Sequence, residues 1–161
     1  MPWKHTACEA RPVSGQTLFP LIEAQLDEGR HVRFTVSGSS MAPLLIHGRD
    51  SVELVCARGA ALKKGDIILF QPFPGRYILH RITRVLPGGY ITTGDGNLHR
   101  DGFVPAPCVM GKAVAVYRKG RRISCSALHW RLLFRLWMAL FPVRGALLRL
   151  LAAARRRIHP V

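Results

Sequence analysis

The segment Tyr77-Ile78-Leu79-His80-Arg81-Ile82-Thr83-Arg84-Val85 has the alternation and the β-branched content of a β-strand. Turn-forming residues bound it on both sides, at Pro72–Gly75 and at Pro87–Gly89. Alternation places His80 on the same face as Ile78 and Ile82. A histidine on such a half-buried face is either a hydrogen-bonded core residue or a general base with restricted access to water.

Similar short runs lie on both sides of this segment and are separated by Gly48, Gly65 and Gly94–Gly96. They are His31–Val36, Ser51–Ala57, Asp66–Gln71, Tyr90–Thr93 and Gly111–Tyr117. Strands this short and this regularly interrupted predict a mainly β fold, either a small twisted sheet or a partly closed barrel, and not a parallel α/β core.

Helices are predicted at both ends of the β-rich region. Leucine and isoleucine side chains recur at helical spacing over about Thr17 to Glu28, and Gly29 closes this short N-terminal helix. A helical C-terminal region begins near Ser124, and Pro142 is expected to kink it or to split it into two helices. The chain therefore divides into an N-terminal helical segment (1–29), a β-rich domain (30–123) and a basic helical tail (124–161).

Charge is distributed unevenly along the chain. The sequence holds 24 Lys and Arg against 9 Asp and Glu, a formal net charge of +15. The last acidic residue is Asp101, and residues 102–161 carry 12 of the basic side chains. Such a tail suggests anionic lipid, nucleic acid or an acidic partner. Nucleic acid is the least favoured of these, because no recognisable nucleic-acid-binding module is present.

Two interpretations of the tail stay open. Its helices pack on the β domain with solvated arginines, or they lie in a membrane interface with Trp130 and Trp137 at headgroup depth. In the second case residues 128–157 contact anionic lipid, and Arg155–Arg157 add electrostatic attraction.

The N-terminal residues Met1–Ser14 lack the apolar core of a secretory signal, and no apolar run is clearly long enough to span a membrane. We therefore expect a cytoplasmic or peripherally membrane-associated protein. The four cysteines are widely spaced, which indicates neither a zinc site nor a disulfide framework. We expect no metal ion or other cofactor.

The segment Ser37-Gly38-Ser39-Ser40-Met41-Ala42-Pro43 follows the first predicted strand. Glycine and small hydroxyl residues of this kind form ordinary turns. They also suit a serine nucleophile, which must stand exposed on a sharp turn beside backbone N–H groups that receive an oxyanion.

A second polar segment is Thr93-Gly94-Asp95-Gly96-Asn97-Leu98-His99-Arg100-Asp101. Aspartate, asparagine and glycine at this density form tight turns, in which Asp95 acts as a turn cap. Alternatively, Asp95 or Asp101 orients His80, as the acid does in a Ser-His-Asp arrangement.

Five pieces in this order resemble the type I signal peptidases and the wider superfamily that includes LexA-like self-cleaving repressors. They span Val36 to Val116, about half of the chain. The pieces are Gly38-Ser39-Ser40-Met41-Ala42-Pro43 followed by Gly48-Arg49-Asp50, Lys64-Gly65-Asp66-Ile67-Ile68, Leu79-His80-Arg81-Ile82, Gly94-Asp95-Gly96-Asn97, and Gly111-Lys112-Ala113.

The resemblance implies a role for each candidate residue. Ser40 corresponds to the nucleophile, and His80-Arg81 matches the archaeal and endoplasmic-reticulum members, which have a histidine as general base. Asp101, six positions beyond Asp95, corresponds to the residue that orients the histidine, and Asp95 is then a structural residue near the site.

The oxyanion hole and the loop differ from the family pattern. The Ser40 N–H is expected to be one oxyanion donor, and Ser39 or Ser37 is a candidate for the second. Gly96 is inserted between Asp95 and Asn97, Ala42 replaces an acidic residue, and the N-terminal membrane anchor of the family is missing.

The function implied is that of a serine endopeptidase that cleaves an extended leader or signal-type peptide after small residues. The main alternative is a LexA-like regulatory or binding protein that acts on nucleic acid or on a partner protein. Roughly 30 residues precede the first strand, too few for a helix-turn-helix domain, which disfavours this alternative. A third possibility is a catalytically idle binding module with the same fold.

Overall fold

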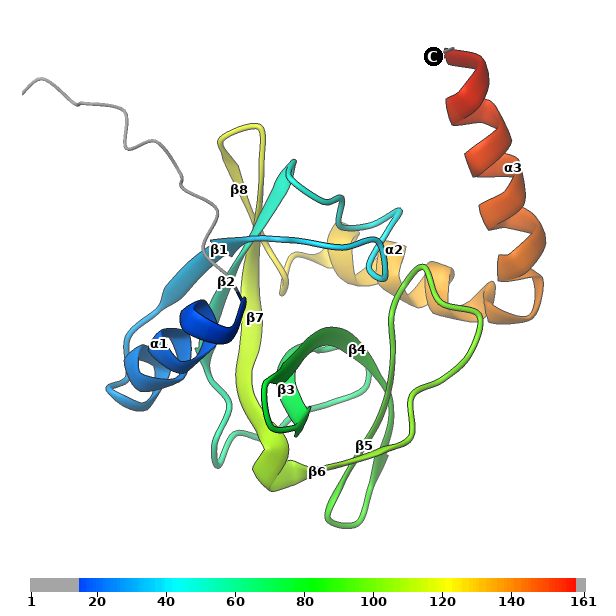
Figure 1. The fold of residues 1–161 in the computed structure, drawn as a ribbon. Coiled ribbons are helices and arrows are strands. Elements are labelled where there is room, and N and C mark those ends of the chain that lie inside the picture. Colours follow the sequence, from blue (N-terminus) through cyan, green and yellow to red (C-terminus); the bar gives the residue numbers. More distant parts are fainter. Residues whose placement is uncertain (1–14, 159–161) are drawn as a thin grey trace, which may run out of the picture.

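The structure is a computed structural model that describes residues 15–158, with side chains described for residues 17–151. It is mainly β, with one eight-stranded antiparallel sheet and three short helices (Figure 1). The strands are β1 (Val32–Thr35), β2 (Asp50–Cys56), β3 (Ile67–Phe73), β4 (Arg76–Leu86), β5 (Gly89–Thr93), β6 (Phe103–Pro105), β7 (Val109–Arg118) and β8 (Arg121–Ser124). The helices are α1 (Gly15–Asp27), α2 (Leu128–Ala139) and α3 (Arg144–Ile158).

The sheet is open, with the strand order β1-β2-β7-β3-β4-β5-β6. The long strand β7 pairs with β2 along one edge, and β3 and β8 share its other edge. Strand β4 pairs with β3 over Arg76–Arg81 and with β5 over Arg81–Leu86. This leaves β1 and the first half of β4 each with an edge that no described strand covers.

All six predicted runs form strands, so the expected mainly β fold is confirmed. Strands β6 and β8 were not predicted, because β6 is three residues long and ends on Pro105, and β8 begins with two arginines. The predicted N-terminal helix is α1, and Gly29, at φ +75°, follows it in the left-handed conformation that ends many helices.

Two apolar clusters form the core. The larger one includes Val52, Leu54 and Leu69 of the sheet, and α1 contributes Ile22 and Leu26 to it. The aromatic side chains of α2 join the same cluster. Burying each large apolar side chain stabilises the fold by about 1.5–3 kcal/mol, so both helices are held to the sheet mainly by packing. The smaller cluster fills the other face of β3 and β4 with Ile68, Phe70, Ile82, Val104, Val109 and Ala57.

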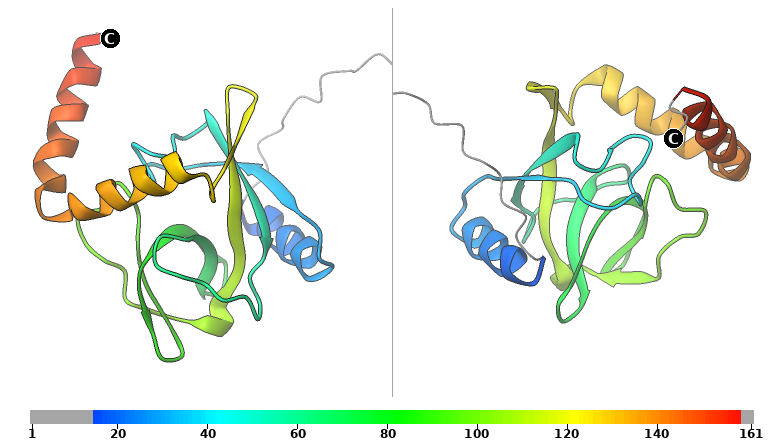
Figure 2. Two further views of the ribbon diagram at one scale, coloured as in Figure 1. Left: turned by 180° about the vertical axis from the view of Figure 1, so that it is seen from behind. Right: turned by 45° about the horizontal axis from the view of Figure 1, so that its top comes forward.

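The C-terminal region is helical and breaks at Pro142, as predicted, in a short 3-10 turn over Phe141–Val143. Helix α2 lies across the domain, and α3 points away from it (Figure 2). Trp130 and Trp137 are buried against the domain, which agrees with the interpretation that α2 packs on the β domain and not with the one that places these tryptophans at headgroup depth. Within the described residues, no helix is both long enough and apolar enough to cross a membrane.

Candidate active site

Ser40 lies in the turn that follows β1. The Ser39 carbonyl accepts a 3.0 Å hydrogen bond from the Ala42 N–H, which closes the turn around Ser40. Met41 and Leu45 are buried and anchor the turn to the core, so the serine next to them has a fixed position. Gly38, at φ +82°, lets the chain leave the strand in a left-handed conformation that other residues rarely adopt.

The Gly94–Asn97 loop packs directly on this turn. The Gly96 N–H donates a 2.7 Å hydrogen bond to the Ser40 carbonyl. A Cβ atom at Gly94 would lie 2.4 Å from the same carbonyl oxygen and 2.9 Å from Nε2 of His80. The Ser40 carbonyl oxygen and His80 Nε2 thus both lie against Gly94. Because glycine has no side chain, the loop can pack against the serine turn and the histidine at once. A Cβ atom at Gly96 would likewise lie 2.8 Å from the Ala42 carbonyl, so a glycine is required at the inserted position.

His80 is held by Asp101. Nδ1 of His80 lies 2.6 Å from Oδ2 of Asp101, and Thr92 Oγ1 donates a second 2.6 Å hydrogen bond to the same oxygen. Burial alone raises the pKa of Asp101, but the hydrogen bonds from His80 and Thr92 outweigh it and leave that pKa below its usual value. An ionised carboxylate only accepts hydrogen bonds, so Nδ1 of His80 carries a proton, and in the neutral imidazole Nε2 then presents its lone pair.

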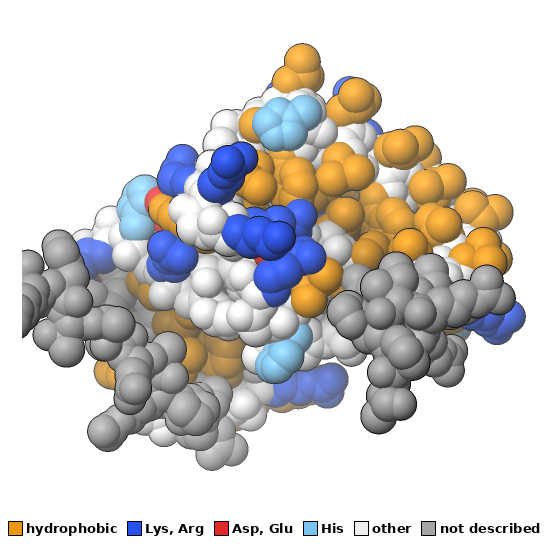
Figure 3. Space-filling view, turned by 90° about the horizontal axis from the view of Figure 1, so that it is seen from above, with side chains coloured by type: hydrophobic (Ala, Val, Ile, Leu, Met, Phe, Trp, Pro, Cys, Tyr) orange, Lys and Arg blue, Asp and Glu red, His pale blue; other side chains and the backbone are white. Residues whose placement is uncertain are grey.

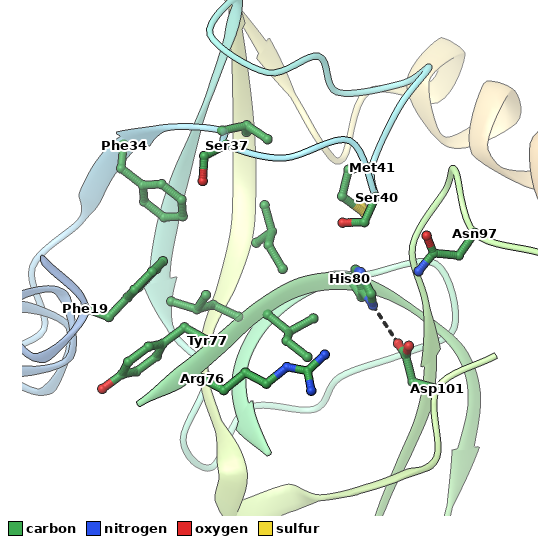
Figure 4. Close-up of a pocket in the computed structure, with 14 residues that line it drawn as sticks. Phe19, Phe34, Ser37, Ser40, Met41, Arg76, Tyr77, His80, Asn97 and Asp101 are labelled. Atoms are coloured by element: carbon green, nitrogen blue, oxygen red, sulfur yellow. Dashed lines mark hydrogen bonds and ion pairs between the residues drawn. The ribbon is translucent and has the colours of Figure 1, made fainter. Parts of the chain in front are cut away.

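Ser40, His80 and Asp101 line one cavity of about 390 Å³. In Figure 4 the three side chains follow one another, with Ser40 on the far side of His80 from Asp101. The rest of the lining combines the polar side chains of Ser37, Arg76 and Asn97 with apolar ones. The apolar lining residues are Phe19, Phe34, Val36, Met41, Leu69, Tyr77, Ile78 and Leu79.

Asp95 does not contact His80 but forms a buried ion pair with Arg81. Its two carboxylate oxygens accept hydrogen bonds from Nε and Nη2 of Arg81 at 2.8 and 2.6 Å. Both side chains are at most 2% exposed. Nη1 of Arg81 also donates to the Gly65 carbonyl at 2.9 Å. This geometry agrees with a structural role for Asp95, in which it fixes the loop that contacts Ser40.

The C-terminal helices support the same loop. The Trp137 indole N–H donates a 3.0 Å hydrogen bond to the Asp95 carbonyl. The buried guanidinium of Arg144 donates to the Gly94 carbonyl at 3.4 Å, and the Phe134 ring of α2 lies 3.6 Å from the Arg81 guanidinium carbon. The Gly94–Asn97 loop is therefore packed between the sheet and α2.

The oxyanion candidates differ in their placement. The Ser40 N–H has no acceptor among the described residues and is available to a ligand. Ser37 lines the cavity, whereas Ser39 is exposed and does not line it. Asn97 also lines the cavity, and its side chain lies next to His80 (Figure 4).

Four residues of the site were not predicted from the sequence: Thr92, Asn97, Trp137 and Arg144. Asn97 belongs to the motif Gly94-Asp95-Gly96-Asn97, and its place in that motif could have identified it as a site residue. The other three reach the site through contacts between distant segments, for which the sequence contains no local signal.

No model of a known protein family matches the chain, and no curated protein matches its sequence significantly. Evidence for a function therefore comes from the geometry of the site and from the motifs of the chain itself.

Proposed function

We propose that this chain is a serine endopeptidase of the signal peptidase type, with Ser40 as nucleophile, His80 as general base and Asp101 as the residue that orients His80. The observation that carries the proposal is the convergence of these residues. They come from a turn, a strand and a loop, line one cavity, and leave Nε2 of His80 directed at the loop that contacts Ser40. A histidine in the core of β4 would not need a carboxylate and a serine in the same cavity, whereas a triad requires both.

The reaction follows from this arrangement. Ser40 Oγ attacks the scissile carbonyl while its proton moves to Nε2 of His80, and Asp101 stabilises the resulting imidazolium. The oxyanion of the tetrahedral intermediate accepts a hydrogen bond from the Ser40 N–H. Collapse of the intermediate breaks the C–N bond, and the leaving amine takes the proton from Nε2. Water then gives a proton to Nε2 and hydrolyses the acyl-enzyme, which restores Ser40.

The proposed substrate is an extended peptide. The uncovered edges of β1 and of the first half of β4 both border the cavity, through Phe34 and through Tyr77–His80. A peptide strand that pairs with such an edge gains main-chain hydrogen bonds and points alternate side chains into the cavity. The cavity is small, and apolar side chains of β1, β3 and β4 form part of its wall, which favours small apolar side chains next to the cleavage site, as the resemblance to signal peptidases also implies. The same resemblance supports our proposal that the open sheet has the signal peptidase and LexA-like fold.

Mass spectrometry of a diverse peptide pool tests the proposal. We expect the wild-type chain to cleave peptides after small residues and the Ser40→Ala chain to cleave none. Ser126→Ala is the matched control, because it removes an exposed serine hydroxyl outside the cavity and leaves cleavage unchanged. Identical peptide patterns for the wild type and Ser40→Ala would reject the peptidase and favour a binding or regulatory role.

A further inference from the structure

A second cavity lies between α2, the β7–β8 hairpin and the segment that leads into β3. It has a volume of about 810 Å³ and shares no lining residue with the candidate active site. Six basic side chains line it, against one carboxylate, that of Asp66. The basic side chains are those of Lys63, Lys64, Lys112, Arg122, Arg131 and Arg135. We call this cavity the basic cleft.

Most of the positive charge in the basic cleft is uncompensated. Asp66 is paired with Lys112 at 2.9 Å, and Arg122 is paired with Glu53 outside the cleft. Lys63, Lys64, Arg131 and Arg135 have no carboxylate partner among the described residues. Four unpaired cations around one cavity attract an anion, and a phosphate group accepts hydrogen bonds from lysine and arginine alike.

Apolar groups line the same cleft. Phe134, Met138 and Ala139 of α2 and Ala113 and Ile67 of the sheet contribute to its wall. A ligand that fills the cleft therefore combines negative charge with apolar surface.

The outer face of α2 is apolar and exposed. Leu128, Leu132 and Leu136 are 79%, 64% and 59% exposed. At 100° per residue they lie opposite the buried aromatic side chains of the helix, and Arg131 and Arg135 lie between these leucines and the basic cleft. Hydrophobic side chains gather on the side of the molecule where α2 and α3 lie (Figure 3). Exposed Leu150 and Leu151 extend the apolar surface onto α3.

We propose that the basic cleft binds the phosphate headgroup of an anionic phospholipid while the exposed leucines of α2 enter the same membrane surface. A bilayer satisfies both features at once, because its headgroups carry the anion and its acyl region accepts the leucines. Nucleic acid would neutralise the cleft but leave the leucines in water. A second copy of the chain would cover the leucines but bring Arg131 and Arg135 of both copies together, with no acidic residue after Asp101 to compensate.

Helix α2 links the proposed lipid-binding surface to the loop beside Ser40. The buried face of α2 contacts Arg81 and the Asp95 carbonyl, so the helix that enters the lipid also supports the active-site loop. Lipid binding itself requires no catalysis, and it is therefore measured on the Ser40→Ala chain.

Co-sedimentation with vesicles tests the proposal. We expect binding to vesicles of phosphatidylcholine mixed with an equal amount of phosphatidylglycerol, and little binding to phosphatidylcholine alone. Arg135→Ala should weaken binding to the anionic vesicles about fivefold, the effect of about one basic residue near an anionic surface. Leu132→Glu should weaken it about tenfold or more, because a carboxylate replaces a leucine that would enter the lipid.

Two matched controls separate this site from general charge or hydrophobicity. Arg84→Ala removes an exposed arginine of β4, and Leu21→Glu changes a leucine of α1 that is 60% exposed and lies well apart from α2 (Figure 1). Both controls should bind like the parent chain. Equal binding to both kinds of vesicle, no binding to either, or equal loss in the α2 variants and the controls would overturn the proposal. Tighter binding of the chain to duplex DNA than to anionic vesicles, unchanged in Leu132→Glu, would also overturn the proposal. It would make nucleic acid the ligand of the basic cleft.

Discussion

The two aspartates of the Gly94–Asp101 region should respond in opposite ways to the same isosteric change. Asp95→Asn removes the charge that compensates a buried Arg81 and turns an amide N–H₂ toward one of its two N–H donors. Removing one partner of a buried ion pair costs about 3–5 kcal/mol of folding free energy. For a chain of this length we expect the melting temperature to fall by about 6–20 °C, since each kcal/mol lowers it by about 2–4 °C.

Asp101→Asn should instead affect catalysis. The Asp101 side chain is 25% exposed, and an asparagine oxygen still accepts a hydrogen bond from Nδ1 of His80, so we expect a much smaller fall in melting temperature. Peptide cleavage should drop about 10⁴-fold, because the imidazolium loses its carboxylate and the correct tautomer is no longer enforced. Thermal unfolding followed by circular dichroism and cleavage rates on one peptide measure the two effects.

A clear outcome would refute these assignments. If Asp95→Asn melted like the wild type but did not cleave peptides, Asp95 would act in the reaction. If Asp101→Asn cleaved at the wild-type rate, the hydrogen bond to His80 would have no catalytic role.

Two further predictions concern the site loop and the acid stability of the fold. Gly94→Ala would place a methyl group 2.4 Å from the Ser40 carbonyl oxygen, so we expect cleavage to fall about 100-fold or more, whereas Gly102→Ala, whose Cβ meets no atom within 4 Å, should cleave normally. Hydrogen bonding from Arg122 lowers the pKa of Glu53 to about 2 from an ordinary 4.5. A carboxyl with a lowered native pKa stabilises the fold above its unfolded pKa, so denaturant titrations should show unfolding free energy falling from about pH 5 toward pH 2. In Arg122→Ala this fall should be smaller, and an unchanged fall would contradict the assignment.

Local patterns predicted much of the fold and the main candidate residues. The alternation around His80 and the glycine and proline breaks predicted six of the eight strands, because such patterns depend on neighbouring residues. The order of short motifs also indicated that Ser40, His80 and Asp101 belong together, and the structure brings them to one cavity.

Contacts between distant segments could not be predicted in this way. The tryptophans of α2 fit a membrane interface by composition, but Trp137 is bound to the Asp95 carbonyl and Trp130 lies against Arg118, and both partners lie in other elements. The basic cleft is formed by β3, β7, β8 and α2 together, and no single segment contains its pattern. Thr92 likewise reaches Asp101 only because the loop after β5 folds back onto the strand.

The most direct test of the proposed Ser-His chemistry is a comparison of kcat/KM for Ser40→Ala, His80→Ala and the double variant on one cleaved peptide. Residues that act as a unit in one reaction are strongly non-additive. We predict that each single variant loses about 10⁶-fold and that the double variant loses no more than either one. Cleavage that survives in Ser40→Ala, or losses that multiply in the double variant, would contradict a mechanism in which His80 activates Ser40.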